Sequence, residues 1–281
     1  MPNAINHIAI VLPAYNEEKD LPALLDNIRE QVSSMPFGYT VVVVDDGSKD
    51  RTAAICEEKA REMPLKLVRH QVNKGLGDAL QTGLRAGWLI GDAVVVMDAD
   101  NTHNPAHIRE MVAIIASGRS DVVIASRFRK GSIVQGVPFL RQLMSWGCFL
   151  SMKLLLPYRN VRDYSTGFRA YSSAMLGRLI SNSGEKIIQE SSFACMLELL
   201  LRLRWLGARV EEIPYMLRYD LKEGVSKMRV WRTIQRYFGV VSRYWALDQL
   251  PQRQEEPLAA LREQYRARAR AAGHKHSPFI A

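Results

Sequence analysis

Cysteine is scarce in this chain of 281 residues, and its placement does not suggest pairing. The three cysteines, Cys56, Cys148 and Cys195, lie far apart in the sequence. A disulfide framework or a zinc site needs closely patterned cysteines, so the sequence indicates neither. Three isolated thiols fit the reducing environment of a cytosol.

Long apolar runs are also missing. Residues 1–12 have no basic stretch ahead of an apolar core, as a secretory signal would have. A membrane-spanning helix needs roughly 18 to 20 uncharged apolar residues. The nearest candidate, 142–152, is shorter and is bracketed by Arg141 and Lys153. We therefore expect a cytoplasmic protein, either soluble or at the cytoplasmic face of a membrane.

Charge is unevenly distributed along the chain. Residues 1–120 contain 12 Lys and Arg against 16 Asp and Glu, whereas residues 121–281 contain 26 against 13. The composition, with 47% hydrophobic and 24% charged residues, is that of a globular protein. A basic second half indicates an anionic partner, such as phospholipid headgroups, a phosphorylated substrate or nucleic acid. A solvated basic tail is the alternative.

Two periodicities alternate in the first half. Short apolar runs rich in Val and Ile are typical of buried parallel strands, and the segments between them have helical spacing. The expected strands are His7–Leu12, Thr40–Val44, Leu65–Arg69, Ala93–Met97 and Asp121–Ala125. The expected helices are Glu17–Gln31, Asp50–Glu62, Gly77–Trp88 and Pro105–Ser117. This alternation predicts an α/β fold, a doubly wound, mostly parallel sheet with helices on both faces.

The pattern changes after about residue 130. We expect residues 1–130 and 131–250 to form the two halves of one domain, the second with amphipathic helices. We expect residues 251–281 to form a basic, flexible tail that begins with a fraying helix. Further expected elements are helices at Lys186–Leu206 and Met228–Leu247 and a strand at Arg209–Ile213.

Acidic side chains follow several of the expected strands. Ligands of open α/β sheets bind beyond the carboxyl ends of the strands, near a reversal of strand order. Asp98 and Asp100 come directly after the fourth strand, and Mg²⁺ and Mn²⁺ favour carboxylates together with substrate phosphates. Carboxylates crowded against apolar strands also need a compensating cation. The pair predicts a metal site, although Asp-x-Asp alone is equally typical of a solvated turn.

Two more strand ends carry candidates for ligand binding. Asp45 and Asp46 precede Gly-Ser, which is ordinary turn chemistry, but one carboxylate could accept a hydrogen bond from a nucleobase. The segment 73–77 follows the third strand and opens a helix, where the backbone can approach a ligand. It fails as a dinucleotide-binding fingerprint, because its third glycine position is Leu80.

The order of these motifs resembles that of family 2 glycosyltransferases. The matching segments are Pro13–Glu18, Val44–Ser48, Asn73–Gly77, Met97–Asp100 and Ala125–Arg127. Beyond them, Asp163–Tyr171 resembles the acceptor-side motif of the dolichyl-phosphate (polyprenyl-phosphate) mannosyltransferase branch. Glu212–Pro214 and Gly224–Lys227 are similar to later signatures of that branch. The resemblance covers residues 6–247.

The resemblance implies a GT-A-like fold with a nucleotide-sugar-binding half and an acceptor-side half. It implies inverting, metal-dependent transfer of a hexose from GDP-mannose or a UDP-sugar to a polyprenyl or dolichyl phosphate or a related acceptor. The implied metal, Mg²⁺ or Mn²⁺, is held by Asp98 and Asp100. The implied donor-binding residues are Pro13, Ala14, Tyr15, Glu17, Asp45, Asp46, Asn73, Gly75, Gly77, Ser126 and Lys227. The implied catalytic residues are Asp98, Asp100, Arg127, Asp163 and Arg169.

The roles implied for the basic residues concern phosphates. Arg127, with Ser126, would face the donor phosphates, and Arg169 and Lys227 would serve the acceptor phosphate or the product diphosphate. The chain departs from the branch at two positions, which bear on the sugar and the metal geometry. Thr102 stands where a metal-binding Gln is usual, and Leu221, next to Lys222, stands where a basic residue is usual.

The acceptor decides whether a general base is needed. A lipid phosphate is already ionised near neutral pH, whereas a hydroxyl acceptor needs a carboxylate to take its proton. Asp163 is the first candidate and Glu198 the second, although Glu198 is equally typical of a helix-surface salt bridge. The aromatic and basic helix expected at 228–247 favours contact with an anionic membrane, unless its apolar stripe packs on the catalytic domain.

Three other functions compete with this interpretation. Asp98–Thr102 fits the Asp-x-Asp-x-Thr signature of haloacid-dehalogenase-like phosphatases, with Asp98 as the nucleophile, but that motif normally follows the first strand. A nucleotidyltransferase would begin with a Gly-rich basic loop, which 13–18 lacks. A non-catalytic basic module could bind nucleic acid, but carboxylates at three strand ends would repel phosphates, so nucleic acid is not expected.

Overall fold

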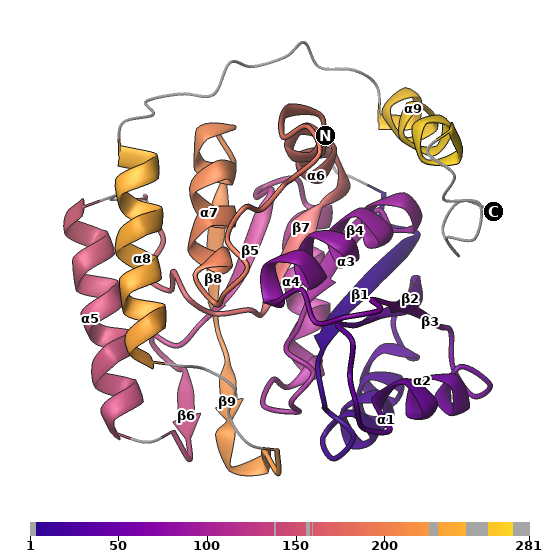
Figure 1. Ribbon diagram of the computed structural model, residues 1–281, viewed down its shortest axis with the longest axis horizontal. Coiled ribbons are helices and arrows are strands. Elements are labelled where there is room, and N and C mark those ends of the chain that lie inside the picture. Colours follow the sequence, from indigo (N-terminus) through magenta and orange to yellow (C-terminus); the bar gives the residue numbers. More distant parts are fainter. Residues whose placement is uncertain are drawn as a thin grey trace.

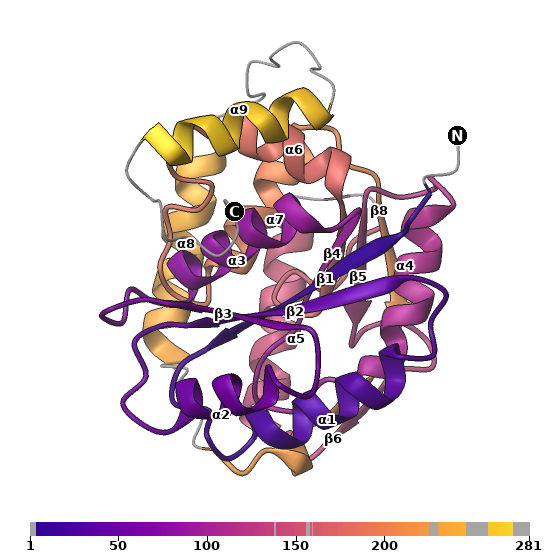
Figure 2. The same ribbon diagram turned by 90° about the vertical axis from the view of Figure 1, so that its right-hand side faces the viewer.

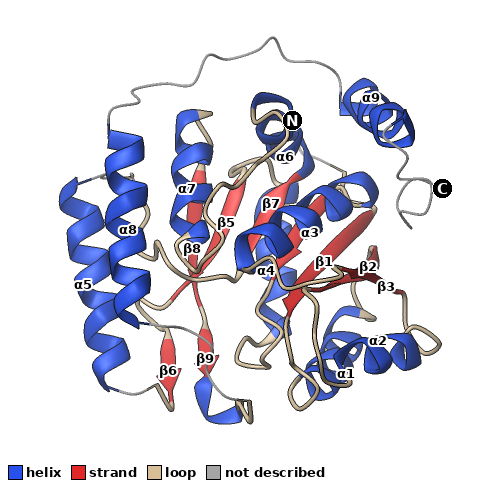
Figure 3. Ribbon diagram, in the orientation of Figure 1, coloured by secondary structure: helices blue, strands red, loops and turns tan. Residues whose placement is uncertain are grey.

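A seven-stranded sheet forms the centre of the computed structural model, which describes residues 4–137, 139–155, 158, 160–224, 230–245 and 258–271. The strand order is β3-β2-β1-β4-β7-β5-β8, and only β7 runs antiparallel to its neighbours (Figure 1 and Figure 3). The strands are β1 (His7–Ala14), β2 (Gly38–Asp45), β3 (Leu65–Arg69), β4 (Ala93–Val96), β5 (Val122–Ser126), β7 (Arg169–Ser172) and β8 (Val210–Pro214). A separate parallel pair joins β6 (Ile133–Gln135) to β9 (Met216–Arg218). The predicted doubly wound, mostly parallel α/β fold is confirmed.

Alternating side chains of the strands build two cores, one on each face of the sheet. Ile10 lies opposite Val41 and belongs to one core, whereas the next residue, Val11, lies opposite Val42 and belongs to the other. All four are fully buried. Burying a side chain of this size contributes about 1.5–3 kcal/mol. Because both faces are covered, β1 from Ile8 onward, β2 at Val41–Val44 and β4 are continuous apolar runs in the sequence.

Helices cover the two faces. One layer contains α1 (Leu21–Val32), α2 (Thr52–Lys59), η1 (Pro105–His107) and α4 (Ile108–Ala116), and the other contains α3 (Leu76–Ile90), α6 (Ser173–Asn182) and α7 (Cys195–Trp205). Figure 2 shows α1 and α2 on one side of the sheet and α3 and α6 on the other. Gly83 allows α3 to lie close to β1, since a Cβ there would come within 2.3 Å of Val11 Cγ1.

The order of the strands reverses between β1 and β4. From β1 the chain moves outward through β2 and β3, and it then returns to β4 on the other side of β1. Such a reversal opens a crevice at the carboxyl ends of the strands, where ligands of this fold class bind. The acidic residues after β2 and β4 therefore lie beside the crevice.

Two helices, α5 (Phe139–Leu155) and α8 (Val230–Trp245), lie at the β8 end of the molecule (Figure 1). Along α5, large apolar side chains recur every three or four residues and are 57–80% exposed. They are Phe139, Leu143, Trp146, Leu150 and Leu154, which we call the α5 stripe. No helix in the described part of the chain combines the length and apolarity that crossing a bilayer requires.

The helix expected at 186–206 is wrong in its first half, since α7 begins only at Cys195. The preceding main chain lies against the start of α3, where Gly77 N donates to Ser191 O at 3.1 Å. A Cβ on Gly77 would lie 1.9 Å from Glu190 O, and Gly75 has a φ of 96°. Residues 189–191 are therefore held in a loop by a tertiary contact that helical spacing does not reveal.

The C-terminal stretch contains helix α9 (Leu258–Ala271), where the sequence predicted a fraying helix ahead of a flexible tail. Leu261 packs over Gly177 of α6, and Arg262 Nη2 donates to Gly91 O at 2.6 Å, just past the end of α3. A cation at the carbonyl end of a helix satisfies exposed oxygens and complements the helix dipole. Apolar contacts also place the helix, because Leu258, Leu261 and Tyr265 pack against the core.

Candidate active site

A cavity of about 810 Å³ lies beyond the carboxyl ends of β1, β2 and β4. Ten residues predicted from the sequence line it: Pro13, Ala14, Tyr15, Glu17, Asp46, Asn73, Gly75, Asp98, Asp100 and Arg127. The opposite wall includes Ser145 and Ser151 of α5 and Ile234 and Tyr237 of α8. Five predicted residues are not among the lining residues: Asp45, Gly77, Ser126, Asp163 and Arg169. Lys227 lies outside the described residues.

Asp98 and Asp100 lie in different environments, although one residue separates them. The Asp98 side chain is 39% exposed, and its Oδ2 is 3.7 Å from His103 Nε2, too far for a hydrogen bond. Burial and the charge of Asp100 raise the pKa of Asp98. Asp100 instead accepts from Lys222 Nζ at 2.5 Å and from Thr102 Oγ1 at 2.7 Å. Burial opposes ionisation of Asp100, but attraction to Lys222 and His103 outweighs it and lowers the pKa of Asp100.

The Asp98 carboxylate fits a divalent cation. Its raised pKa indicates a carboxylate without a full compensating charge, and such a group is a ready oxygen ligand. No cluster of three His, Cys, Asp or Glu side chains suitable for a metal occurs in the described part of the chain. Mg²⁺ is commonly held by only one or two carboxylates, with phosphate oxygens and water as further ligands. Asp98, with Asp100 beside it, would hold such an ion together with a bound diphosphate.

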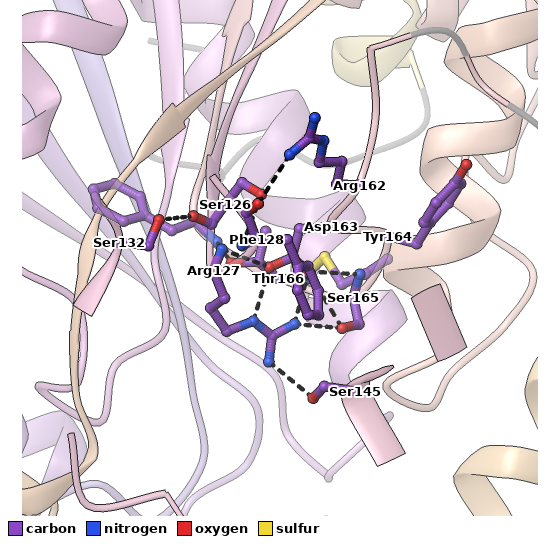
Figure 4. A network of polar contacts seen from close by, with 12 residues as sticks. Ser126, Arg127, Phe128, Ser132, Ser145, Arg162, Asp163, Tyr164, Ser165 and Thr166 are labelled. Carbon is purple, nitrogen blue, oxygen red and sulfur yellow. Dashed lines mark hydrogen bonds and ion pairs between the residues drawn. The ribbon is translucent and has the colours of Figure 1, made fainter. Parts of the chain in front are cut away.

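Arg127 joins three parts of the cavity wall (Figure 4). It follows β5, and its guanidinium binds both carboxylate oxygens of Asp163, with Nε–Oδ2 at 2.8 Å and Nη2–Oδ1 at 2.7 Å. Nη2 also donates to Ser165 Oγ at 2.6 Å, and Nη1 donates to Ser145 Oγ of α5 at 3.3 Å. Burial opposes the charge, but Asp163 outweighs it and raises the pKa of Arg127. Arg127 is therefore a fixed cation beside the cavity.

Glu212 of β8 positions this ion pair through the main chain that carries Asp163. Its Oε1 accepts hydrogen bonds from the main-chain N–H groups of Arg162 at 2.6 Å and Asp163 at 2.7 Å. Glu212 thereby fixes the loop that carries Asp163, and Asp163 in turn fixes Arg127. The late Glu-Ile-Pro segment of the sequence thus has a structural role that its composition alone does not reveal.

Asp45 and Asp46 face different parts of the fold. Asp46 accepts from the main-chain N–H groups of Lys74 at 3.0 Å and Gly75 at 2.8 Å, and its Oδ1 is 2.6 Å from His70 Nδ1. It therefore organises the loop after β3 and also lines the cavity. Asp45 is only 1% exposed and accepts from the turn that follows it. Of the two, Asp46 is the one placed to meet a ligand.

Arg169 and Glu198 lie away from the cavity lining. Arg169 is fully buried, and its guanidinium donates to two main-chain carbonyl oxygens at 2.9 Å each. The Arg169 side chain lies in the core, so the predicted contact of Arg169 with a phosphate does not match the structure. Glu198 is also fully buried and accepts from Tyr244 Oη at 2.5 Å and from Glu190 N at 2.7 Å. Its ion pair with Arg202 is a buried one rather than a surface salt bridge.

Lys222 and His103 are site residues that sequence reasoning did not identify. His103 Nδ1 accepts a hydrogen bond from Asp98 N at 3.2 Å. The His103 ring stacks on the Phe168 ring, with 5.1 Å between the ring centroids. Lys222 reaches Asp100 because Arg218 N donates to Thr102 O at 2.9 Å, which brings the chain after β9 beside the chain after β4. The available signal was the position of Lys222, one residue after the expected basic position at Leu221.

A comparison with known protein families assigns the chain to one of them. The model described as "Glycosyl transferase family 2" matches residues 9–180, which contain most of β1, all of β2 and β4 and the Asp98–Asp100 pair. The chain belongs to this family. Family membership gives no support to the phosphatase interpretation, and Asp98 follows the fourth strand along the chain rather than the first.

Two curated relatives of this family 2 chain are mannosyltransferases. It is 32% identical over 209 residues to a dolichol-phosphate mannosyltransferase of Pyrococcus furiosus, covering 74% of this chain but only 55% of that protein. The chain thus spans just over half the length of that relative. It is 31% identical over 223 residues to an undecaprenyl-phosphate mannosyltransferase of Micrococcus luteus, covering 79% of this chain and 87% of that protein.

Solved structures of glucosyl-3-phosphoglycerate synthase from Mycobacterium tuberculosis share the fold. One, in complex with Mn²⁺, UDP and glucosyl-3-phosphoglycerate, has a TM-score of 0.64 at 20% identity, covering 88% of this chain and 82% of that one. Another, in complex with Mg²⁺ and UDP, has a TM-score of 0.62 at 19% identity, covering 88% and 81%. The likeness confirms the expected GT-A-like fold.

Proposed function

We propose that this family 2 chain transfers a hexose from a GDP- or UDP-linked donor to a polyprenyl or dolichyl phosphate, inverting the anomeric carbon, with Mg²⁺ or Mn²⁺ as cofactor. The observation that carries the proposal is the cavity with two chemically different walls. Carboxylates at strand ends form one wall, which suits a metal and a nucleoside diphosphate. Helices α5 and α8 form the other, which suits a lipid phosphate. The names of the two curated relatives support this acceptor class.

The donor would occupy the sheet side of the cavity. Pro13, Tyr15 and Glu17 line it after β1, and Asp46 lines it after β2. An apolar ring and a carboxylate next to each other are the usual components of a nucleobase pocket, one for stacking and one for an N–H group. The diphosphate would then lie toward Asp98, at the centre of the strand ends.

Catalysis would depend on positive charge at the departing diphosphate. A divalent ion held by Asp98 and Asp100 supplies Lewis-acid stabilisation there when bound. Arg127 adds a cation that Asp163 and Ser165 already hold in one orientation. A charge that is oriented in advance stabilises the developing charge without reorganising during the reaction.

The candidates for a general base favour an acceptor that is already ionised. Asp163 is fully buried, and Arg127 holds both of its oxygens, so attraction and hydrogen bonds lower the pKa of Asp163 despite its burial. Glu198 is buried against Tyr244. Neither carboxylate lines the cavity, where it would have to meet a hydroxyl proton. A phosphate acceptor needs no such base.

The α5 stripe supports a location at the cytoplasmic face of an anionic membrane. Residues 122–162 contain seven Lys and Arg and no acidic residue, and residues 224–247 contain five and none. An exposed apolar helix face in a stretch of sequence whose only charges are positive is typical of a helix that lies in the headgroup region of an anionic bilayer. Because α5 also lines the cavity, a lipid phosphate could enter from that surface.

Donor and acceptor can be tested separately. Thermal unfolding is measured with GDP-mannose, UDP-glucose and UDP-N-acetylglucosamine, each with and without Mn²⁺. We expect one donor to raise the melting temperature only when Mn²⁺ is present. Transfer is then measured to undecaprenyl phosphate and, as a matched control, to undecaprenol, which lacks the phosphate. Transfer only to the phosphate supports the proposal, whereas equal transfer to undecaprenol or transfer to neither contradicts it.

A Leu143→Glu/Leu150→Glu variant tests the membrane surface. Each leucine is 57% exposed and lies on the α5 stripe, so its replacement removes apolar contact and adds repulsion from anionic lipid. We expect affinity for phosphatidylglycerol-containing vesicles to fall about tenfold or more in a sedimentation assay. Val72→Glu, at another exposed apolar residue (64%), is the matched control and should bind as the wild type does. Equal binding of all three proteins would remove α5 from the membrane surface.

A further inference from the structure

Both carboxylate oxygens of Asp100 already have partners from the protein itself. Oδ1 accepts from the Thr102 hydroxyl at 2.7 Å, and Oδ2 accepts from Lys222 Nζ at 2.5 Å. The two members of the ion pair are well shielded, with Asp100 16% and Lys222 10% exposed. A divalent ion that used Asp100 would therefore have to displace an ammonium group. Asp98, two residues away, has no such competitor within hydrogen-bond distance among the described residues.

Hydrogen bonds hold the main chain next to Lys222 in place. The ammonium group is therefore positioned beside Asp100. Lys222 directly follows η2 (Tyr219–Leu221). The next two N–H groups, of Glu223 and Gly224, donate to the buried carboxylate of Asp20 at 2.8 and 3.0 Å. A Cβ on Gly224 would lie 2.7 Å from Asp20 Oδ2, so the contact depends on a close approach. Only the four-carbon stem of the lysine remains free to reorient.

We propose that Lys222 is an internal counter-ion that competes with the divalent metal for Asp100 and is released when a nucleoside diphosphate binds. The inference rests on the proposed function, which supplies the metal–diphosphate ligand. A doubly charged ion cannot share Asp100 with an adjacent ammonium without strong repulsion. The diphosphate removes this conflict, because its oxygens coordinate the metal and also give Lys222 a new anionic partner in the same cavity.

The consequence is cooperative binding of metal and nucleotide. Metal alone must break the Lys222–Asp100 pair without replacing it, so its affinity is low. Metal with diphosphate breaks the same pair and forms another, so each ligand raises the affinity for the other by the same factor. In this scheme the empty enzyme is kept from holding a metal ion in an unproductive state, and Lys222 reaches the leaving group only after the donor has bound.

The test is a titration of Mn²⁺ against the protein alone, with free Mn²⁺ followed by electron paramagnetic resonance. We expect Lys222→Met to bind Mn²⁺ about tenfold more tightly than the wild type. The enhancement of Mn²⁺ affinity by UDP or GDP should shrink by a similar factor. Lys186→Met is the matched control, since that side chain is 60% exposed and its nearest carboxylate oxygen, on Asp78, is 3.8 Å away. Unchanged or weaker Mn²⁺ binding by Lys222→Met would overturn the inference.

Two further variants separate the expected effect on Mn²⁺ affinity from any effect on folding. Lys222→Gln keeps a hydrogen-bond donor for Asp100 but has no charge, and it should also bind Mn²⁺ more tightly. In an Asp100→Asn background the Lys222→Met change should have no effect on Mn²⁺ affinity, and an undiminished effect would contradict competition at Asp100. None of these titrations uses a sugar or an acceptor. A chain that gives these results without transferring sugar fails the proposed function only, and one that transfers sugar with unaltered Mn²⁺ titrations fails this inference only.

Discussion

An Asp98→Asn variant is expected to lose sugar transfer by a factor of about 10²–10³ or more while its folded state becomes no less stable. Transfer falls because the amide no longer holds a divalent ion at the leaving diphosphate. Stability behaves differently because burial and the Asp100 charge raise the pKa of Asp98 in the folded state. A raised carboxyl pKa favours folding when the group is protonated, and that contribution is lost as the pH rises through the folded pKa. At neutral pH the ionised group therefore opposes folding, and Asn removes the opposition.

The measurement combines steady-state transfer with thermal unfolding at pH 7. Asp26→Asn is the control, because Asp26 lies on the surface of α1, 46% exposed, and pairs there with Arg29 and Lys59. It should keep wild-type transfer. If Asp98→Asn retains transfer, Asp98 does not hold a required metal. If it loses transfer together with several degrees of melting temperature, the loss reflects folding, and the assignment of Asp98 to the metal fails.

The sequence predicted the sheet well because burial on two faces leaves a simple pattern. Ile10 and Val11 face opposite cores, so consecutive positions of β1 are apolar, and the strand is visible as a run. The cavity edge followed from the same strands, since Asp98 and Asp46 come where they end. Helix α7 was harder, because Glu190 and its neighbours are held in a loop by the glycines at the start of α3. No local pattern records such a contact.

Side-chain roles were the least predictable part. Arg169 lies within the acceptor-side motif, yet its guanidinium is buried against carbonyl oxygens. Asp163 was a candidate base and is instead a partner of Arg127. Lys222 was not assigned a role and reaches Asp100. Spacing along the chain identifies which strand ends converge, but it does not say which charged groups neutralise one another after they converge.

The partnership of Arg127 and Asp163 leads to the largest expected change in stability. Asp163→Asn should lower the free energy of unfolding by about 3–5 kcal/mol, because it leaves a guanidinium that is only 19% exposed without its counter-charge. For a domain of this size, each kcal/mol shifts the melting temperature by roughly 2–4 °C. Asp121→Asn is the matched control, since it breaks a similar bidentate pair with Arg209 that is 60% exposed and should cost no more than about 1 kcal/mol.

The pH dependence of the same variant gives an independent check. Burial opposes ionisation of Asp163, but attraction and hydrogen bonds from Arg127 prevail, so the pKa of Asp163 is lowered in the folded state. A lowered carboxyl pKa stabilises the fold above the unfolded value, near 3.9 for Asp, and this contribution is lost as the pH falls through the folded pKa. Urea unfolding between pH 7 and pH 3 should therefore give a difference between wild type and Asp163→Asn that is constant at higher pH and shrinks at the acid end. A difference that stays constant to pH 3 would mean that lost packing, and not the ion pair, accounts for the destabilisation.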